Sequence, residues 1–376
     1  ATTRVAPEVC AAMLAHLDGT TGFANPSSGQ HEAGRRAAEV IERARSEVAT
    51  ELRCVADEVI FTSGATESIN LALRGVALAN ARHGRHIVTT QIEHKATLAC
   101  CDALAEEGFE ITRVPPGQDG RVDPAAIADA VRPDTLLVSV MHTNNETGVM
   151  QPLQDIAAVA EDLGVLLHVD AAQAAGKLPI DLSRISIDLL SLSAHKFHGP
   201  KGIGCLFVRD RSRLPLRPLT FGGGQEFGLR PGTLSTHQIV GLATALKLVS
   251  EHRDRDHQHV SLLRATFIET LSARLPLKVH GARDAVSPYI VNLSIPGISS
   301  DALINQCAAE IAIASGSACS SGTVEPSHVL RAMGVEGDLL YGAVRVSFDR
   351  YHTAEDIDAA VDAIVRSANK IRELNA

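Results

Sequence analysis

The chain has 376 residues, of which 45% are hydrophobic and 21% are charged, and its formal net charge is −9. These values are typical of a globular protein and allow one large domain and a smaller one. The negative charge and the low aromatic content of 3% argue against a broad nucleic-acid-binding surface and against a base-stacking platform. We find no signal peptide and no apolar run long enough to span a bilayer. We therefore expect a cytoplasmic protein that binds neither a membrane nor nucleic acid directly.

Seven cysteines are scattered along the chain, and none belongs to a Cys-x-x-Cys pair. The sequence therefore encodes neither a zinc ribbon nor a thioredoxin-like motif, and we expect no metal site. An odd number of scattered cysteines in a chain of this length favours reduced thiols in a cytoplasmic compartment. The seven are Cys10, Cys54, Cys100, Cys101, Cys205, Cys307 and Cys319.

Helical patterns at residues 6–17 and 34–54 flank a Gly-rich, Pro-containing break, and strands then alternate with helices. The apolar runs of the strands are continuous, as in strands that are covered on both faces. Strands that alternate with helices favour a mostly parallel sheet. The seven strands predicted for this sheet lie at residues 58–62, 86–90, 109–114, 135–141, 165–170, 187–193 and 203–208.

The pattern changes after residue 232, where a long helix is predicted over residues 235–257. We interpret the charged run at its end, EHRDRDHQH, as a solvated helix terminus. Short strands mixed with helices follow, which indicates a smaller α+β domain. These strands are predicted at residues 278–280, 290–294, 311–314 and 344–348.

The patterns together predict an α/β fold of two domains. The large domain, residues 14–250, holds the mostly parallel seven-stranded sheet flanked by helices. The small α+β domain takes residues 1–13 and 251–376. Ligands of open α/β sheets bind at the carboxyl ends of the strands, so polar residues that directly follow a predicted strand are candidates for a binding site.

The segment TSGATES, residues 62–68, follows a predicted strand and opens a helix. Backbone amides and hydroxyls at such a turn can surround a phosphate, and the helix dipole favours its negative charge. An ordinary helix N-cap uses the same residue types, so this motif alone is a weak signal. It is not a Walker loop, because Gly-Lys-Ser/Thr is missing, and the chain has no Gly-x-Gly-x-x-Gly.

Four further segments place polar side chains just after predicted strands. EHKA contains His94, although a lone histidine is more often structural than catalytic. HTNNETG, residues 142–148, brings two amides and a carboxylate towards the same edge. HVDAAQAAGK ends a strand with Asp170 and continues to Gln173. SLSAHKFHGPKG carries Lys196, although most loop lysines are simply solvated.

These groups together suggest pyridoxal 5'-phosphate (PLP) as a cofactor. PLP requires a lysine for its Schiff base and an acid that keeps its pyridine nitrogen protonated. Lys196 and Asp170 meet these requirements, a histidine can stack on the ring, and the turn at residues 62–68 can hold the phosphate. A hydride-transfer enzyme would need neither the lysine nor the acid in these places.

The ordered motifs TSGATE, EHKA, NNETG, HVDAAQ, SAHKFHGPKG, GGGQE…RPGT and SGSAC resemble those of the NifS/IscS-type cysteine desulfurases of the class V aminotransferase family. The resemblance covers nearly the whole chain. It implies a fold-type I PLP-dependent transferase that converts L-cysteine to L-alanine and transfers the sulfane sulfur to an enzyme cysteine. It also implies an obligate homodimer with composite sites.

The resemblance further implies a role for each motif residue. Lys196 would bind the cofactor covalently and move protons, His94 would stack on the ring and act on the leaving sulfur, and Asp170 would pair with the ring nitrogen. Arg345, in VRVSFDR, matches the arginine that grips the substrate carboxylate. Asn145 and Gln173 would contact the ring-oxygen side of the cofactor, and Asn145 would also contact the substrate. The phosphate would be held by Ala65, Thr66, Ser193 and His195. Thr233 would reach the phosphate bound by the partner subunit.

Cys319, in ASGSACSSG, differs from the other cysteines. We interpret Cys205, in a strand, and Cys307, in a helix, as small buried hydrophobic residues. Gly and Ser surround Cys319, which is typical of an exposed loop where a thiolate can form and attack. By the resemblance, Cys319 takes the sulfur of the bound cysteine as a persulfide. The long loop at residues 315–326, typical of the NifS/IscS branch, could carry that sulfur to an acceptor protein.

Other functions stay open at this point. A selenocysteine lyase or an aminotransferase of the same family would share the cofactor residues, although an aminotransferase needs no thiol, and a non-catalytic scaffold would keep only the fold. The sulfur acceptor also stays open among the pathways of iron–sulfur cluster assembly, tRNA thiolation and DNA phosphorothioation. The desulfurase DndA is one candidate for the last of these.

Three residues depart from the pattern common to the NifS/IscS-type desulfurases, namely Phe227, Pro231 and Asp349. We expect these differences to affect loop electrostatics and partner recognition rather than the chemistry.

Overall fold

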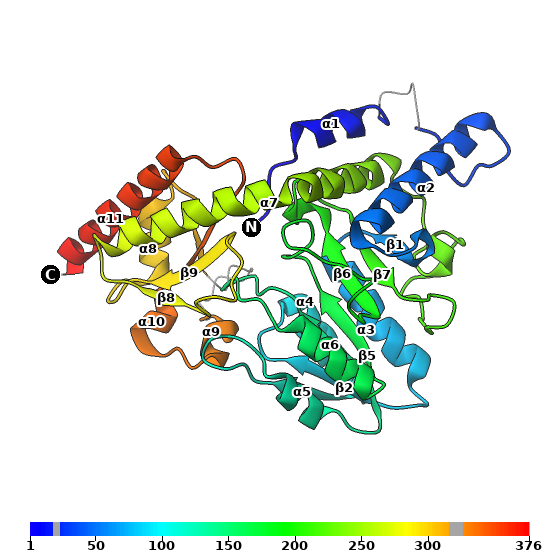
Figure 1. Cartoon of the computed structure of the whole chain (residues 1–376), viewed down its shortest axis with the longest axis horizontal. Coiled ribbons are helices and arrows are strands. Elements are labelled where there is room, and N and C mark those ends of the chain that lie inside the picture. Colours follow the sequence, from blue (N-terminus) through cyan, green and yellow to red (C-terminus); the bar gives the residue numbers. More distant parts are fainter. Residues whose placement is uncertain (18–22, 316–325, 376) are drawn as a thin grey trace. The chain divides into compact units, whose positions relative to one another are not determined.

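The computed structural model describes residues 1–17, 23–315 and 326–375 (Figure 1). The chain folds into two compact units, each with a sheet of its own. Among the described residues, no helix combines the length and the apolar character that a bilayer crossing requires. Unit 1 consists of Ala1–Val114, Pro124–His142 and Pro152–Arg253, and unit 2 of Pro115–Asp123, Thr143–Gln151 and Asp254–Ala376.

Unit 1 is built on a seven-stranded sheet. Its strands are β1 (Val59–Thr62), β2 (His86–Thr90), β3 (Glu110–Val114), β4 (Thr135–Met141), β5 (Leu166–Asp170), β6 (Leu189–Ser193) and β7 (Gly204–Val208). They lie in the order β1-β7-β6-β5-β4-β2-β3. β6, β5, β4, β2 and β3 pair in parallel, and β7 pairs antiparallel with both β1 and β6. The mostly parallel sheet predicted from the sequence is therefore confirmed.

Helices and short 3-10 turns connect these strands. The long helix α2 is amphipathic, and its buried residues recur every three or four positions, as in Ala37, Ile41, Ala44 and Val48. The helical segments are α1 (Pro7–Leu14), α2 (Glu32–Leu52), η1 (Ala56–Glu58), α3 (Ala65–Asn80), α4 (Lys95–Glu106), α5 (Pro124–Ala130), α6 (Leu153–Asp162), η2 (Ala194–Lys196), η3 (Glu226–Gly228) and α7 (Thr236–Ser272), the last of which continues into unit 2.

The continuous apolar runs place the central strands inside unit 1. Every residue of β2, β6 and β7 is buried. Because successive side chains of a strand point to opposite faces, complete burial means that both faces are covered. Helix α3 packs against β1 and β4 to β7, and its Ile69, Leu73 and Val76 share a core with Ile60 and Leu206 of the sheet.

Unit 2 has a four-stranded antiparallel sheet in the order β10-β11-β9-β8. Its core joins Phe267 of α7, Leu293 of β9 and Val361 of α11. The predicted smaller α+β part is thus present. Its elements are β8 (Lys278–His280), β9 (Ile290–Ser294), α8 (Ser300–Cys307), β10 (Ala314–Ser315), α9 (His328–Ala332), α10 (Gly337–Tyr341), β11 (Ala343–Ser347) and α11 (Ala354–Asn375).

Two predicted elements of the second half differ from the structure. Helix α7 does not end at residue 257 but runs to Ser272, because buried apolar residues up to Leu271 recur at helical spacing. The charged run is therefore not a solvated terminus, and within it Asp256 is buried and pairs with Arg350 at 3.0 Å. The strand predicted at 311–314 is displaced, because the residues that pair with β11 are those of β10.

The N-terminal residues belong to unit 1, although we expected residues 1–13 in the small domain. The backbone N of Thr3 donates to O of His195, and that of Ala6 to O of His198. The boundary of the units after Arg253 lies close to the predicted one, and unit 2 also takes two short segments from the first half. The units are groups of residues that contact one another within the chain. They do not test the predicted domain boundaries, which stay a prediction.

A buried ion pair covers the outer edge of β1. The side chains of Arg45 and Glu226 are 3% and 0% exposed, and Nη2 lies 2.7 Å from Oε1. Nη1 of Arg45 donates to O of Val59 at 2.7 Å, and Oε2 of Glu226 accepts from N of Phe61 at 2.6 Å. The pair thereby satisfies backbone groups that an edge strand leaves unpaired, and it fixes the segment at Glu226 and Phe227, whose φ values are both left-handed.

Replacing Arg45 by Met should lower the free energy of unfolding by about 3–5 kcal/mol, because Glu226 would stay buried without its cation. Urea unfolding measures the change. Arg36→Ala is the matched control on the same helix, since its pair with Glu32 is exposed and should be worth less than about 1 kcal/mol. Equal unfolding midpoints for the two variants would show that the buried pair is not stabilising.

Candidate active site

The carboxyl ends of the parallel strands bring three predicted site residues to one edge of the unit 1 sheet. Asp170 is the last residue of β5, His94 follows β2, and Lys196 ends η2 directly after β6. The charges of His94 and Lys196 both act on the carboxyl group of Asp170. The three side chains are near enough for their charges to interact, which agrees with their places at the carboxyl ends of the strands.

Asp170 is buried at the end of β5, with 5% of its surface exposed. Burial raises the pKa of this carboxyl group, because a charge in a low-dielectric interior is poorly solvated. A hydrogen bond from N of Ala172 to Oδ1, at 2.9 Å, and the charges of His94 and Lys196 oppose that shift. The site therefore holds an acid whose ionised form depends on cationic neighbours.

His94 is the N-cap of α4, and its Nδ1 accepts a hydrogen bond from N of Ala96 at 3.1 Å. An accepting Nδ1 places the proton of the neutral imidazole on Nε2. Burial lowers the pKa of His94, and Lys196 and Lys95 lower it further, while Asp170 raises it. The ring is thus a neutral donor through Nε2 at neutral pH.

The Lys196 turn is held from the N-terminal segment of the chain. O of His195 accepts from N of Thr3 at 2.9 Å, and Nδ1 of His195 lies 2.9 Å from Oγ1 of Thr2. Burial, followed by Lys196 and other lysines, lowers the pKa of His195 to about 4. Gly199 closes the turn against Ala194, where a Cβ would lie 2.7 Å from the Ala194 Cβ, so a larger residue would displace the turn.

The TSGATES turn lies against the end of β6, as a phosphate cradle requires. Gly64, with φ of 150°, caps α3, whose first residues are Ala65 and Thr66. A Cβ on Gly64 would lie 3.3 Å from Oγ of Ser193, and one on Gly204 would lie 2.7 Å from Cα of Gly64. These close approaches bring Ser193 and the N-terminus of α3 together.

Gln173 carries an unsatisfied buried polar atom near the end of β5. The residue is 6% exposed, and its Oε1 has no hydrogen-bond partner among the residues described. Buried polar atoms are rarely left in this state unless a ligand or water completes them. Gln173 therefore points to a missing donor at this edge.

Other predicted residues lie outside this group. Asn145 and Arg345 belong to unit 2, where Nη1 of Arg345 donates to O of Asn145 at 2.9 Å. Thr233 is exposed in the loop before α7. Cys319 lies outside the described residues. In the part of the chain that the structure covers, no cluster of three His, Cys, Asp or Glu side chains could hold a metal ion.

Sequence reasoning missed Glu93, which lies between β2 and His94. Its side chain is 0% exposed, and its Oε1 accepts from Oγ1 of Thr90 at 2.7 Å and from N of Met141 at 2.9 Å. Burial raises its pKa to about 8. The signal available in the sequence was an acidic residue next to the candidate histidine at a strand end.

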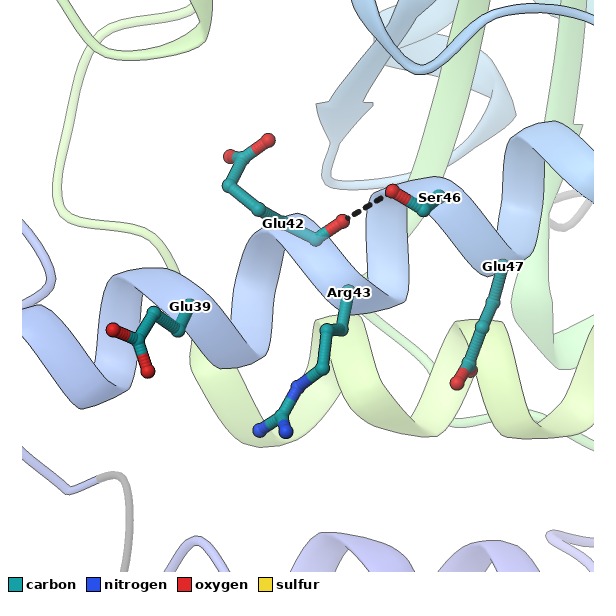
Figure 2. A pocket seen from close by; sticks show the side chains of 5 residues that line it. All are labelled: Glu39, Glu42, Arg43, Ser46 and Glu47. Carbon is teal, nitrogen blue, oxygen red and sulfur yellow. Dashed lines mark hydrogen bonds between the residues drawn. The ribbon is translucent and has the colours of Figure 1, made fainter.

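Two surface depressions lie beside α2 rather than at Lys196. One, of about 540 Å³, is lined by Glu39, Glu42, Arg43, Ser46 and Glu47. Figure 2 shows Glu39, Arg43 and Glu47 on one side of this helix, and Oγ of Ser46 donates to O of Glu42 at 2.9 Å. The other, of about 350 Å³, lies between α2 and the segment at Glu226. None of the predicted site residues lines either depression.

Comparison with known proteins agrees with the motif order. The family described as aminotransferase class-V matches residues 1–360. A protein named cysteine desulfurase IscS, from Stutzerimonas stutzeri (strain A1501), is 44% identical over 375 residues, which cover 100% of this chain and 93% of the relative.

Solved structures show the same relationship. A NifS-like protein superposes with a TM-score of 0.92 at 36% identity, covering 98% of this chain and 97% of its own. DndA from Streptomyces lividans superposes with a TM-score of 0.80 at 41% identity, covering 92% of this chain and 97% of its own. The resemblance and the fold type inferred from the motifs are thus confirmed, and the chain belongs to the aminotransferase class-V family.

Proposed function

We propose that the chain is a PLP-dependent cysteine desulfurase, which converts L-cysteine to L-alanine and takes the sulfane sulfur onto a cysteine of its own. The observation that carries this proposal is the grouping of Asp170, His94 and Lys196 at one edge of the unit 1 sheet. The full-length similarity to a protein named cysteine desulfurase supports it.

The residues at this edge fit pyridoxal 5'-phosphate. The buried carboxyl group of Asp170 suits a protonated ring nitrogen, and a donor on the ring would satisfy the buried Oε1 of Gln173. When bound, this cofactor supplies a protonated ring that takes up the electron pair left as a proton leaves the substrate α-carbon. The phosphate would be held by Ala65, Thr66, Ser193 and His195.

Lys196 and His94 are the groups that move or hold protons. The amine of Lys196 would hold the cofactor covalently and exchange the proton at the α-carbon of the substrate. The neutral imidazole of His94, with its proton on Nε2, would donate to the substrate sulfur and orient it. Both side chains come from rigid strand ends, which keeps their positions fixed.

Cys319 would accept the sulfur. Its thiolate attacks the sulfur atom of the bound cysteine, so that an S–S bond forms as the C–S bond breaks. The electron pair of the broken bond stays with the β-carbon, which is then protonated to give alanine, and Cys319 keeps the persulfide. This assignment is carried by the motif SGSAC, whose Gly and Ser neighbours suit a reactive thiol.

Arg345 would bind the substrate carboxylate, with Asn145 beside it. The bond from Nη1 to O of Asn145 orients the guanidinium on β11. A planar guanidinium that is fixed in this way can form paired hydrogen bonds to a carboxylate, which an ammonium group cannot reproduce.

The working form would be a cytoplasmic homodimer. Thr233 is exposed in the loop before α7, which suits a contact with the phosphate held by a partner subunit. The persulfide would pass to an acceptor protein of iron–sulfur cluster assembly or of nucleic-acid thio-modification. These two classes of acceptor are the alternatives that the sequence leaves.

The activity test combines the purified chain with L-cysteine and a reductant. We expect alanine and sulfide in equal amounts without any added keto acid. Demand for a keto acid would indicate an aminotransferase, and strong preference for L-selenocysteine in competition would indicate a selenocysteine lyase. Absence of both products from a cofactor-loaded protein would contradict catalysis of this kind.

Cys319→Ser should abolish sulfide release while leaving the visible absorbance of the bound cofactor unchanged, because serine cannot form a persulfide. The rate of sulfide release and the visible spectrum measure the two effects. Cys10→Ser, which removes an exposed cysteine on α1, is the control and should keep normal activity. Full activity of the Cys319 variant would exclude this nucleophile.

Asp170→Asn should lower kcat by about 10²–10³-fold, because an amide cannot stabilise a protonated ring nitrogen as a carboxylate does. Steady-state kinetics provide the measurement. Asp188→Asn is the control, since Asp188 is a partly buried carboxyl group just before β6, and its Oδ2 accepts from N of Leu167 at 2.8 Å. An equal loss in both variants would mean that a general structural effect explains the result.

Arg345→Lys should lower kcat/KM for L-cysteine by about 10-fold or more through a higher KM, because lysine keeps the charge but loses paired hydrogen bonding. Arg264→Lys is the control, because Arg264 also lies in unit 2 and also donates to a backbone carbonyl, O of Ile290. An unchanged KM in the Arg345 variant would place substrate binding elsewhere.

A further inference from the structure

Glu93 is a buried carboxyl group that the proposed reaction leaves without a role. Its side chain is 0% exposed. Two donors, the hydroxyl of Thr90 at 2.7 Å and the backbone N of Met141 at 2.9 Å, meet at the same oxygen, Oε1. Both a carboxylate and a neutral carboxylic acid can accept hydrogen bonds in this way, so the two bonds fix the position of the group and burial decides its charge.

The two hydrogen bonds join the carboxyl ends of neighbouring strands. Thr90 closes β2 and Met141 closes β4, and these strands pair in parallel. His94 directly follows Glu93, and Asp170 is the partner of Met141 in the register of β4 and β5. Glu93 therefore precedes one proposed site residue, His94, in the chain and is bonded to the backbone beside the other, Asp170.

The electrostatic surroundings of Glu93 favour its neutral form. Burial is the largest cause of the raised pKa of Glu93, and Asp170 on β5 raises this pKa further. The hydrogen bonds from Thr90 and Met141 lower it, and the resulting pKa is about 8. Two carboxylates in one buried site repel each other, so that one of them keeps its proton.

The other titratable neighbours act on this pair from separate elements. Lys196 on η2 and His94 before α4 act on Asp170 and favour its ionised form. Burial is the main cause that raises the pKa of the Cys101 thiol on α4, and Glu93 adds to this shift. Lys196 and His94 thus act on Asp170 rather than on Glu93, which favours the proton on Glu93.

We infer that Glu93 is a positioning residue that works as a neutral acid. It fastens the ends of β2 and β4, fixes the places of His94 and Asp170, and leaves the negative charge of the site to Asp170. The inference deepens the proposed desulfurase function and rests on it for the kinetic part of its test.

The first test compares Glu93→Gln with Glu93→Ala. Gln keeps the accepting Oε1 and carries no charge, so it should stay within about fivefold of the wild-type kcat/KM. Ala leaves the ends of β2 and β4 unfastened and should lose about 10²-fold, the effect of misplaced reacting groups. An equal loss in both variants would overturn the inference, because the ionised form would then be required.

Thermal unfolding of the cofactor-free protein across pH provides a second test. Folded Glu93 keeps its proton up to about pH 8, whereas the unfolded chain loses it near the ordinary value of 4.5. The contribution of this group to stability is therefore complete below pH 4.5 and is lost as the pH rises to 8. The Tm of Glu93→Gln relative to wild type should rise across this window, and a flat difference would overturn the inference.

Glu67→Gln is the matched control for these measurements. Glu67 accepts from N of Ser63 at 2.6 Å and pairs with Arg230 at 2.9 Å. Burial raises its pKa, but these hydrogen bonds and the cation outweigh burial and lower it. At neutral pH, the Tm of Glu67→Gln should therefore be lower than that of the wild type, whereas the Tm of Glu93→Gln should be higher.

Infrared spectra of the cofactor-free protein test the protonation state directly. At neutral pH the wild type should show a carbonyl band of a protonated carboxylic acid that Glu93→Gln lacks, and identical spectra in this region would overturn the inference. If the wild type forms no alanine, the desulfurase proposal fails by itself. The Tm and infrared results then still decide the protonation state of Glu93.

Discussion

A carboxyl group buried at the end of β5 is the constraint on which the candidate site depends. Burying Asp170 is unfavourable unless hydrogen bonds and positive charge compensate for the lost water. The chain provides the backbone N of Ala172, the ring of His94 and the amine of Lys196. Because β2, β5 and β6 run parallel in one sheet, their carboxyl ends meet at the same edge. The order and direction of the strands are therefore sufficient to bring His94, Asp170 and Lys196 to one edge of the sheet.

Close backbone packing fixes the surroundings of this carboxyl group. Gly204 lets the turn before α3 approach β6, and Gly199 lets the turn of Lys196 fold against Ala194. The N-terminal segment adds a hydrogen bond from Thr3 to His195. Glu93 joins β2 to β4 on the same edge. All of these contacts except the bond from the Thr90 hydroxyl to Glu93 involve main chain as donor, acceptor or close neighbour, so the scaffold largely holds the site.

The sequence predicts the sheet and much of the site, because continuous apolar runs end at polar residues. Asp170 and Lys196 can be found in this way, since each follows such a run. Glu93 could not, because its acceptor role depends on Met141 from another strand. The Arg45–Glu226 pair spans 181 residues of sequence, and no local pattern joins such distant positions. The charged run in α7 was misread for the same reason, because the burial of its Asp256 depends on the distant Arg350.

The central claim is that the amine of Lys196 holds the cofactor beside Asp170. Borohydride reduction of the purified protein, followed by digestion and peptide mass spectrometry, tests it most directly, because reduction makes the lysine–cofactor bond permanent. The account predicts a pyridoxyl-phosphate adduct on the peptide that contains Lys196. An adduct on a different lysine, or no adduct in a protein loaded with the cofactor, would contradict it.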